Sequence, residues 1–180
     1  VKCSKVFFDE AKKLGCEPLM ERTGHSPIKE KMKEIKSPLS GEMSGHVCYG
    51  DDFYGYDDAM YVGLRLLRIL SHKNQNLHDI INKYPKTFST PETRFDVDEI
   101  KKFKIIDEIK ERLSSFEGNI IDIDGIRVET DEGWFLMRAS NTQNQLTCRV
   151  ESTSKDGLKK LIEVVENQLQ LSNVNFKFTI

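Results

Sequence analysis

A hairpin signal in the second half of the chain constrains the fold more strongly than any other feature of this sequence. Residues 120–123 and 126–129 alternate apolar and polar side chains, and Asp124-Gly125 joins them. Asp-Gly between two alternating segments is typical of a tight turn between antiparallel strands, because glycine tolerates the positive φ that such turns need. Two further strands are expected at 134–138 and 146–151. This half of the chain therefore predicts an antiparallel sheet.

Helical patterns accompany these strands. Residues 98–116 carry apolar side chains at helical spacing, and Gly118 follows them. A second helix is expected after Ser154, a residue suited to capping a helix N-terminus, and residues 175–180 are expected to form a last strand. We therefore predict an α+β domain built on an antiparallel sheet for residues 94–180. The apolar side chains that define the two helical patterns are Ile100, Phe103, Ile106, Ile109, Leu113, Leu158, Leu161, Ile162, Val165 and Leu169.

The first half of the chain is dominated by helical patterns separated by polar loops. Ser4 can cap a first helix that Gly15 ends. Ser26-Pro27 has the sequence of a second helix start, with Ser as the cap and Pro at the first helical position. Asp57-Asp58 precede a third helix, and residues 77–84 predict a fourth. The residues on the predicted inner face of the third helix are Met60, Leu64, Leu67 and Leu70.

The segments between these helices set the domain organisation. Residues 39–55 lack a sustained period and predict a long loop with a short strand at 47–49, while residues 17–20 could form another strand. Composition changes at a connector that Pro85 and Pro91 bracket. The predicted organisation is an α/β domain at 1–84, a linker at 85–93 and the α+β domain at 94–180.

The charge balance and the cysteines narrow the classes of function. With 27 Lys and Arg against 29 Asp and Glu, the net charge is −2, so the basic excess typical of nucleic-acid-binding proteins is missing. The apolar runs are too short to span a bilayer. The four cysteines form no CxxC pair, which favours reduced thiols in a cytoplasmic protein over disulfides or a metal site. We therefore expect a small-molecule ligand, with neither nucleic acid nor a membrane as partner.

Two loops in the first half could recognise a polar ligand. Residues 22–27 place His25 beside a helix N-terminus, where free N–H groups favour an anion or a polarised hydroxyl. A capped helix beside a surface histidine explains the same residues. Further along, Glu42, Ser44 and His46 stand between or beside two glycines; the carboxylate and hydroxyl could hold the hydroxyl groups of a sugar, and the imidazole can exchange a proton near neutral pH. An ordinary turn is the alternative reading.

A third loop has the donors of a phosphate site. Arg138 offers a planar fork that matches phosphate oxygens. Ser140, Asn141 and Thr142 add hydroxyl, amide and turn N–H groups, which together can form an anion-binding concavity. No carboxylate occurs within residues 138–142 to compete for the arginine. A polar turn with a solvated arginine is the alternative.

Other candidate groups are weaker. Asp51-Asp52 and Asp57-Asp58 could suggest a metal site, but the second pair is better explained as negative charge at a helix N-terminus. His72 and His78 are expected at the surface. No GxGxxG, GxxxxGK[ST], HExxH or GxSxG motif occurs. We therefore assign no metal ligands to this chain.

Taken in order, the loops resemble those of the α-D-phosphohexomutase superfamily, specifically its bacterial phosphomannomutase/phosphoglucomutase branch. The resemblance covers essentially the whole chain. It implies the C-terminal part of such an enzyme: a truncated α/β third domain, followed by a fourth domain with a TATA-binding-protein-like α+β fold. The motifs that carry it are Lys2-Cys3, Thr23-Gly24-His25-Ser26, Gly41-Glu42-Met43-Ser44-Gly45-His46, Phe53-Tyr54-Gly55-Tyr56-Asp57-Asp58, Ser89-Thr90-Pro91-Glu92, Asp124-Gly125-Ile126-Arg127-Val128 and Arg138-Ala139-Ser140-Asn141-Thr142.

The resemblance implies a role for each loop. Glu42 and Ser44 would hold sugar hydroxyls. Lys2, His25 and His46 would line the same cleft, with His46 a candidate for proton transfer. The residues that would grip the phosphate that is not being transferred are Arg138, Ser140, Asn141 and Thr142.

The resemblance also implies a reaction. Such enzymes interconvert hexose 1- and 6-phosphates through a phosphoserine and a bisphosphate intermediate, with Mg²⁺ beside the phosphoserine. Neither the serine motif nor the Asp-rich Mg²⁺ motif of the family occurs in this sequence. We therefore expect this chain to bind substrate without catalysing, with the missing N-terminal domains as its partners; a stand-alone phosphosugar-binding module is the alternative. Asn144 stands where the family usually has Pro, which predicts a looser phosphate loop.

Overall fold

The computed structural model describes residues 1–73 and 76–179. The chain divides into two compact units, Val1–Pro85 and Lys86–Ile180, which we call the N-terminal and C-terminal units. None of the described helices has the length and apolar character needed to cross a bilayer.

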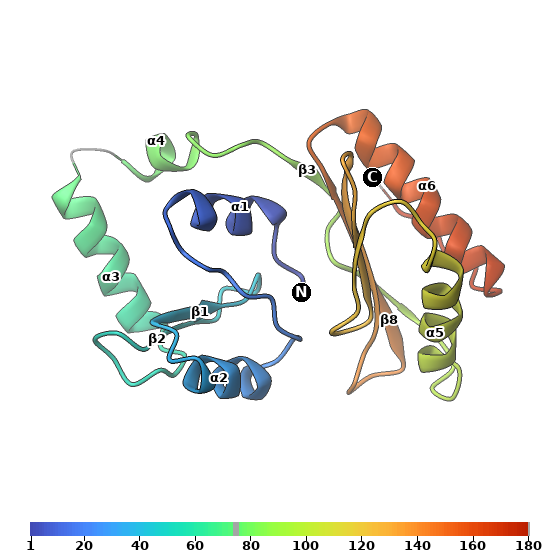
Figure 1. Ribbon diagram of the computed structural model, residues 1–180, viewed down its shortest axis with the longest axis horizontal. Helices are drawn as coiled ribbons and strands as arrows, with labels where there is room; N and C mark the ends of the chain where they lie inside the picture. The colour runs from blue at the N-terminus through green and yellow to red at the C-terminus, as the bar shows by residue number, and fades with distance from the viewer. Residues whose placement is uncertain (74–75, 180) are drawn as a thin grey trace. The chain divides into compact units, whose positions relative to one another are not determined.

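The C-terminal unit is an antiparallel sheet with two helices on one side. The strands follow the order β3-β8-β7-β6-β5, and β4 also pairs with β8. Helices α5 and α6 lie on the same side of this sheet (Figure 1). The elements are β3 (Phe88–Ser89), β4 (Thr93–Asp96), α5 (Lys102–Leu113), β5 (Asn119–Ile121), β6 (Ile126–Glu129), β7 (Gly133–Ala139), β8 (Gln145–Ser152) and α6 (Lys155–Leu171).

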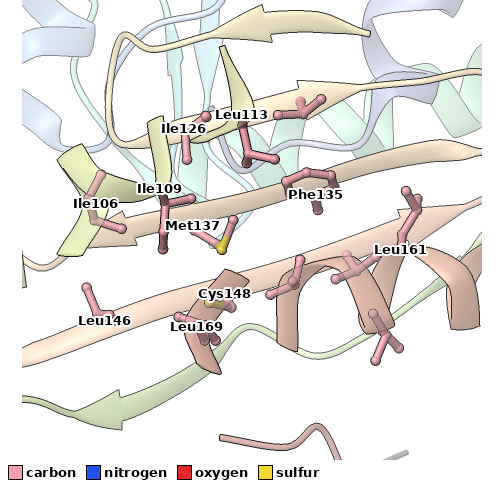
Figure 2. Close-up of a cluster of buried hydrophobic side chains, with 14 of the residues drawn as sticks. Ile106, Ile109, Leu113, Ile126, Phe135, Met137, Leu146, Cys148, Leu161 and Leu169 are labelled. Atoms are coloured by element: carbon pink, nitrogen blue, oxygen red, sulfur yellow. The ribbon is translucent and has the colours of Figure 1, made fainter. Parts of the chain in front are cut away.

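The core of this unit lies between the sheet and the two helices. Strands β7 and β8 pair from Gly133↔Ser152 to Ala139↔Leu146. Because side chains alternate along a strand, this register sends every second apolar residue of both strands toward the helices. Figure 2 shows side chains of α5 and α6 meeting those of the sheet in one buried cluster. Its labelled members are Ile106, Ile109, Leu113, Ile126, Phe135, Met137, Leu146, Cys148, Leu161 and Leu169.

Three local predictions are confirmed in the C-terminal unit. The Asp-Gly turn joins β5 to β6, which pair from Asn119↔Glu129 to Ile121↔Arg127, and Gly125 has φ 83°. Ser154 caps α6 by accepting a hydrogen bond from the Gly157 N–H. The five residues predicted on the inner face of α6 are all buried.

Three expectations for this unit are wrong. The helix predicted from residue 98 begins at Lys102, because Asp98 closes a turn by accepting from the Ile100 N–H; Ile100 is 90% exposed and Phe103 51%. Residues 175–179 form no strand, since the Phe178 N–H donates to a Glu166 carboxylate instead; Ile180 lies outside the described residues. The expected linker at 85–93 contains β3, which pairs with β8.

The N-terminal unit contains four helices and a two-stranded hairpin among its described residues. Strands β1 and β2 pair from Leu39↔Tyr49 to Gly41↔Val47, and Cys48 of β2 forms a bridge with Asp57. The β1 strand was missed in the sequence because three residues, two of them Ser and Gly, show no strand pattern. The elements are α1 (Lys5–Lys13), α2 (His25–Glu34), β1 (Leu39–Gly41), β2 (Val47–Tyr49), α3 (Ala59–His72) and α4 (Leu77–Ile81).

Helix starts in this unit are partly as expected. Ser4 caps α1 and Asp58 caps α3, each through its side-chain oxygen. Helix α2 instead begins at His25, with Gly24 as the cap at φ 130°, so Ser26 lies inside the helix and does not cap it. A backbone in this positive-φ region suits glycine, which lets the chain enter the helix one residue before the Ser-Pro pair. Residues 17–20 form no strand.

Three of the four residues on the predicted inner face of α3 are exposed, and Leu70 is partly buried. Met60, Leu64 and Leu67 are 82%, 64% and 63% accessible. The helix packs through another side: the Tyr61 ring stacks on Phe53 at 3.9 Å, next to Arg65. The side that packs carries the aromatic stack and the Arg65 guanidinium over the Tyr49 ring instead of the aliphatic stripe.

We expect Ile109→Ala to destabilise the C-terminal unit by about 2–5 kcal/mol, because the side chain is fully buried and its removal leaves a cavity in the core. Denaturant unfolding followed by the fluorescence of the single tryptophan, Trp134, measures this directly. The same substitution at exposed Ile100 is the control and should change stability by less than about 0.5 kcal/mol. Equal effects at both positions would contradict the assigned core.

Candidate functional site

The β1–β2 hairpin builds the first candidate site. Its turn is closed by two backbone hydrogen bonds, from the Glu42 N–H to the His46 carbonyl (2.8 Å) and from the Gly45 N–H to the Glu42 carbonyl (3.0 Å). Gly45 adopts φ 91°, which the turn requires. Glu42 and His46 therefore stand at the two ends of one turn, and Ser44 is exposed between them.

Helix α2 brings His25 to the same place. The Gly24 N–H, at the helix N-terminus, donates to a Glu42 carboxylate oxygen at 3.3 Å. The imidazole rings of His25 and His46 lie 4.4 Å apart, centre to centre, at 64°. The structure thus gathers three of the residues predicted to bind sugar, and His25, Glu42 and His46 line one small hollow.

Asp57 completes this cluster and was not predicted to belong to it. Its Oδ2 lies 2.5 Å from His46 Nδ1, and its Oδ1 accepts from the Val47 N–H at 3.3 Å. The hydrogen bond from His46 holds the pKa of Asp57 below its ordinary value, with smaller contributions from the Val47 N–H and the charge of His46. The sequence offered one signal: of two adjacent acids, only Asp58 can cap α3, which leaves Asp57 available for another role.

Lys2 and Cys48 are two further residues of this unit. The Val1 amino group, next to Lys2 in the chain, donates to the Glu21 carbonyl at 2.8 Å. Cys48, the middle residue of β2, is buried and lines the same hollow. Its burial is the main cause that raises the pKa of its thiol. The Cys48 thiol is therefore protonated at neutral pH. The sugar-binding role expected for Lys2 stays a prediction.

The second candidate site is built on the β7–β8 hairpin. Arg138 lies in β7 with its side chain 8% exposed, and its Nε is 3.0 Å from a carboxylate oxygen of Asp124. Residues 138–142 contain no carboxylate, so the sequence pattern suggested an arginine without a competitor. The hairpin turn between β5 and β6 supplies one from outside the loop. Asp124 forms an ion pair with the guanidinium group, whose NH groups are further potential donors.

The loop after Arg138 is held by its own serine. The Ser140 N–H donates to the Gln145 carbonyl at 2.9 Å, and Ser140 Oγ accepts from the N–H groups of Thr142 (3.4 Å) and Gln143 (3.1 Å). Those N–H groups, which we expected to face an anion, therefore have an acceptor within the loop. Asn141 and Thr142 are exposed.

Neighbouring elements anchor the rest of this loop. The buried Lys102 of α5 donates to the Gln143 carbonyl at 2.9 Å, and the Val97 N–H donates to the Asn144 carbonyl at 2.9 Å. These two hydrogen bonds restrain residues 143–144, where Asn144 in place of the family's proline had predicted a looser loop. Lys110 lines a hollow together with Asp124 and Asn141, and adds a cation that sequence reasoning did not select.

Comparison with known proteins places this fold and these loops in one family. Residues 1–88 match "Phosphoglucomutase/phosphomannomutase, alpha/beta/alpha domain III", and residues 92–168 match "Phosphoglucomutase/phosphomannomutase, C-terminal domain". The chain belongs to the phosphoglucomutase/phosphomannomutase family and contains its third and C-terminal domains.

Several relatives have similar sequences or structures. Phosphomannomutase/phosphoglucomutase of Pseudomonas aeruginosa is 41% identical over 94% of this chain, and phosphoglucomutase of Neisseria meningitidis serogroup A is 40% identical. The chain spans 37% and 36% of their lengths. A phosphoglucomutase/phosphomannomutase family protein of Burkholderia thailandensis has a solved structure with a TM-score of 0.88 at 36% identity, covering 98% of this chain and 38% of that one.

A more distant structure shares the fold alone. An N-acetylphosphoglucosamine mutase of Aspergillus fumigatus superposes with a TM-score of 0.62 at 15% identity, over 95% of this chain and 37% of that chain. The arrangement of the two domains' elements is thus compatible with very different sequences.

We expect the Asp57 carboxyl to titrate below 3.8, and His46→Ala to raise its pKa toward that ordinary value, because the main cause of the lowering is removed. The carboxyl carbon signal of Asp57, followed by NMR across the acidic range, measures both. Since the pKa is lowered in the folded state, the stabilisation is present above about pH 4 and is lost as the pH falls through the lowered pKa. His72→Ala is the control, and an unchanged Asp57 pKa in the His46 variant would contradict the pairing.

Proposed function

We propose that this chain is the substrate-recognition part of a phosphohexomutase that interconverts hexose 1- and 6-phosphates. The observation that carries the proposal is the Arg138–Asp124 ion pair, which lies directly before the loop of residues 140–144. It presents an oriented cationic fork beside hydroxyl and amide donors, an arrangement suited to a phosphate group. Membership in a family whose relatives are named as mutases agrees with it.

On the sugar side, we assign Glu42 and Ser44 to the hydroxyl groups of the hexose. A carboxylate accepts from hydroxyls, and a serine both accepts and donates, so together they fix the orientation of adjacent hydroxyls. His25 and Lys2 would contact the same ring. His46, oriented by Asp57, is the candidate for moving a proton at a sugar oxygen, because the carboxylate holds the imidazole in one tautomer.

On the phosphate side, we assign Arg138, Ser140, Asn141 and Thr142 to the phosphate that is not transferred. The intramolecular phosphotransfer itself would occur at a phosphoserine, through a bisphosphate intermediate, in domains outside this chain. The mechanism depends mainly on positioning and charge. This chain's share is therefore substrate recognition, and the transfer itself would be carried out by the remaining domains.

Mg²⁺ would belong with the phosphoserine and not with this chain. Mg²⁺ prefers six oxygen ligands in near-octahedral geometry. The metal-ligating cluster found among the described residues consists of two imidazoles and one carboxylate, which does not fit that ion. The four cysteines are free thiols, in keeping with a cytoplasmic enzyme.

We expect glucose 1-phosphate and mannose 6-phosphate to shift backbone amide signals of Ser140, Asn141 and Thr142 in an NMR titration, with smaller shifts from Glu42 to His46. Arg138→Ala should weaken binding roughly 10- to 100-fold, because a charge-assisted hydrogen-bonding fork is lost. Arg94→Ala is the matched control, since Arg94 pairs with Glu92 at the surface. Equal affinities for the Arg138 variant and the parent chain would refute the phosphate site.

We also expect the purified chain to show no mutase turnover, even with Mg²⁺ and a hexose bisphosphate added, because its sequence carries no serine motif of the family. A coupled assay for the isomerised sugar phosphate measures this, with a full-length family enzyme as the positive control. Turnover that survives repeated purification and tracks the protein concentration would overturn the assignment of recognition without catalysis.

A further inference from the structure

The cluster around the hairpin turn also contains a set of potential metal ligands. His25, His46 and Asp57 each place one potential metal-ligating atom within 4.8 Å of the other two. The three residues come from the start of α2, the end of the β1–β2 turn and the segment before α3. Their convergence is a product of the fold, since no local motif links them.

This donor set selects a class of metal. Two imidazole nitrogens with one carboxylate oxygen are the ligands of many three-residue zinc and iron sites, which leave the remaining positions to water or substrate. Alkaline-earth ions prefer all-oxygen sites. We propose that His25, His46 and Asp57 form a binding site for one divalent transition-metal ion, with Zn²⁺ and Co²⁺ as well-suited occupants.

The backbone holds two of these ligands in place before any ion binds. Asp57 forms a β-bridge with Cys48 and accepts from the Val47 N–H, so its carboxylate is fixed to the strand that directly follows His46. The N-terminus of α2 is tied to the turn by the Gly24–Glu42 hydrogen bond. Binding an ion therefore requires adjustment of side chains and no rearrangement of the hairpin.

The adjustments are small. With metal–ligand bonds of about 2.0–2.2 Å, two ligand atoms on a tetrahedral ion lie about 3.4 Å apart. His46 Nδ1 and Asp57 Oδ2, now at 2.5 Å, would separate by roughly 1 Å as the ion takes the place of the proton between them. His25 is exposed as the first residue of α2, so its ring can turn toward the ion. Lys29 and Glu42, one cation and one carboxylate, line the same hollow.

Cobalt(II) chloride, titrated into the whole chain, tests the proposal. Cys3 and Cys16 are replaced by Ser in all samples, so that these two thiols do not compete for the ion. We expect visible d–d absorption that saturates at one ion per chain and is lost on adding Zn²⁺. His25→Ala and His46→Ala should each weaken Co²⁺ binding by about tenfold or more, since even groups one step removed from a metal have effects of that size.

The two remaining histidines provide matched controls. His72→Ala and His78→Ala should leave the affinity for Co²⁺ unchanged. His25→Ala removes an exposed side chain, so an amide NMR spectrum like that of the parent separates lost ligation from lost folding. The proposal is overturned if Co²⁺ shows no saturable binding up to about 1 mM, if either cluster variant binds as the parent does, or if the His72 or His78 variant loses the ion.

Discussion

The pairing of β7 with β8 is the interaction on which the C-terminal unit depends. Its register sends Phe135 and Met137 toward α5 and α6, and places Arg138 on the opposite side. A slip of one residue would exchange the two sets and drive the arginine into the apolar core. The same hairpin ends in the loop that begins at Ser140. One set of backbone hydrogen bonds therefore determines both the core and the position of the candidate phosphate site.

The N-terminal unit is organised differently. Its described residues include few buried apolar side chains, chiefly Met32 and Cys48, so aliphatic packing holds less of it together. Polar contacts around Asp57 join the β1–β2 hairpin to the start of α3. The carboxylate that secures the backbone is also the one that orients His46. Stability and site geometry are coupled here, because one side chain serves both.

Elements with strong local patterns could be predicted from the sequence. Helix α6 combines a serine cap with a regular apolar stripe, and the Asp124-Gly125 turn fits few conformations, so both were found. Weaker or competing signals failed. Strand β1 is too short to show a pattern, and the aliphatic stripe of α3 does not reveal that the Tyr61 side packs instead. The roles of the loops bearing Glu42 and Arg138 stay predictions, and the contacts of Asp57 with His46 and of Asp124 with Arg138 were not predicted.

Residue types, the kinds of secondary structure and the order of the motifs are properties of the sequence by itself, and they are sufficient to indicate the family. The pairs His46–Asp57 and Arg138–Asp124 were decided only by tertiary structure. In each pair the two residues come from different segments that antiparallel pairing brings together. Local spacing carries no record of such contacts, because they depend on the register of strands and on which side of a helix packs.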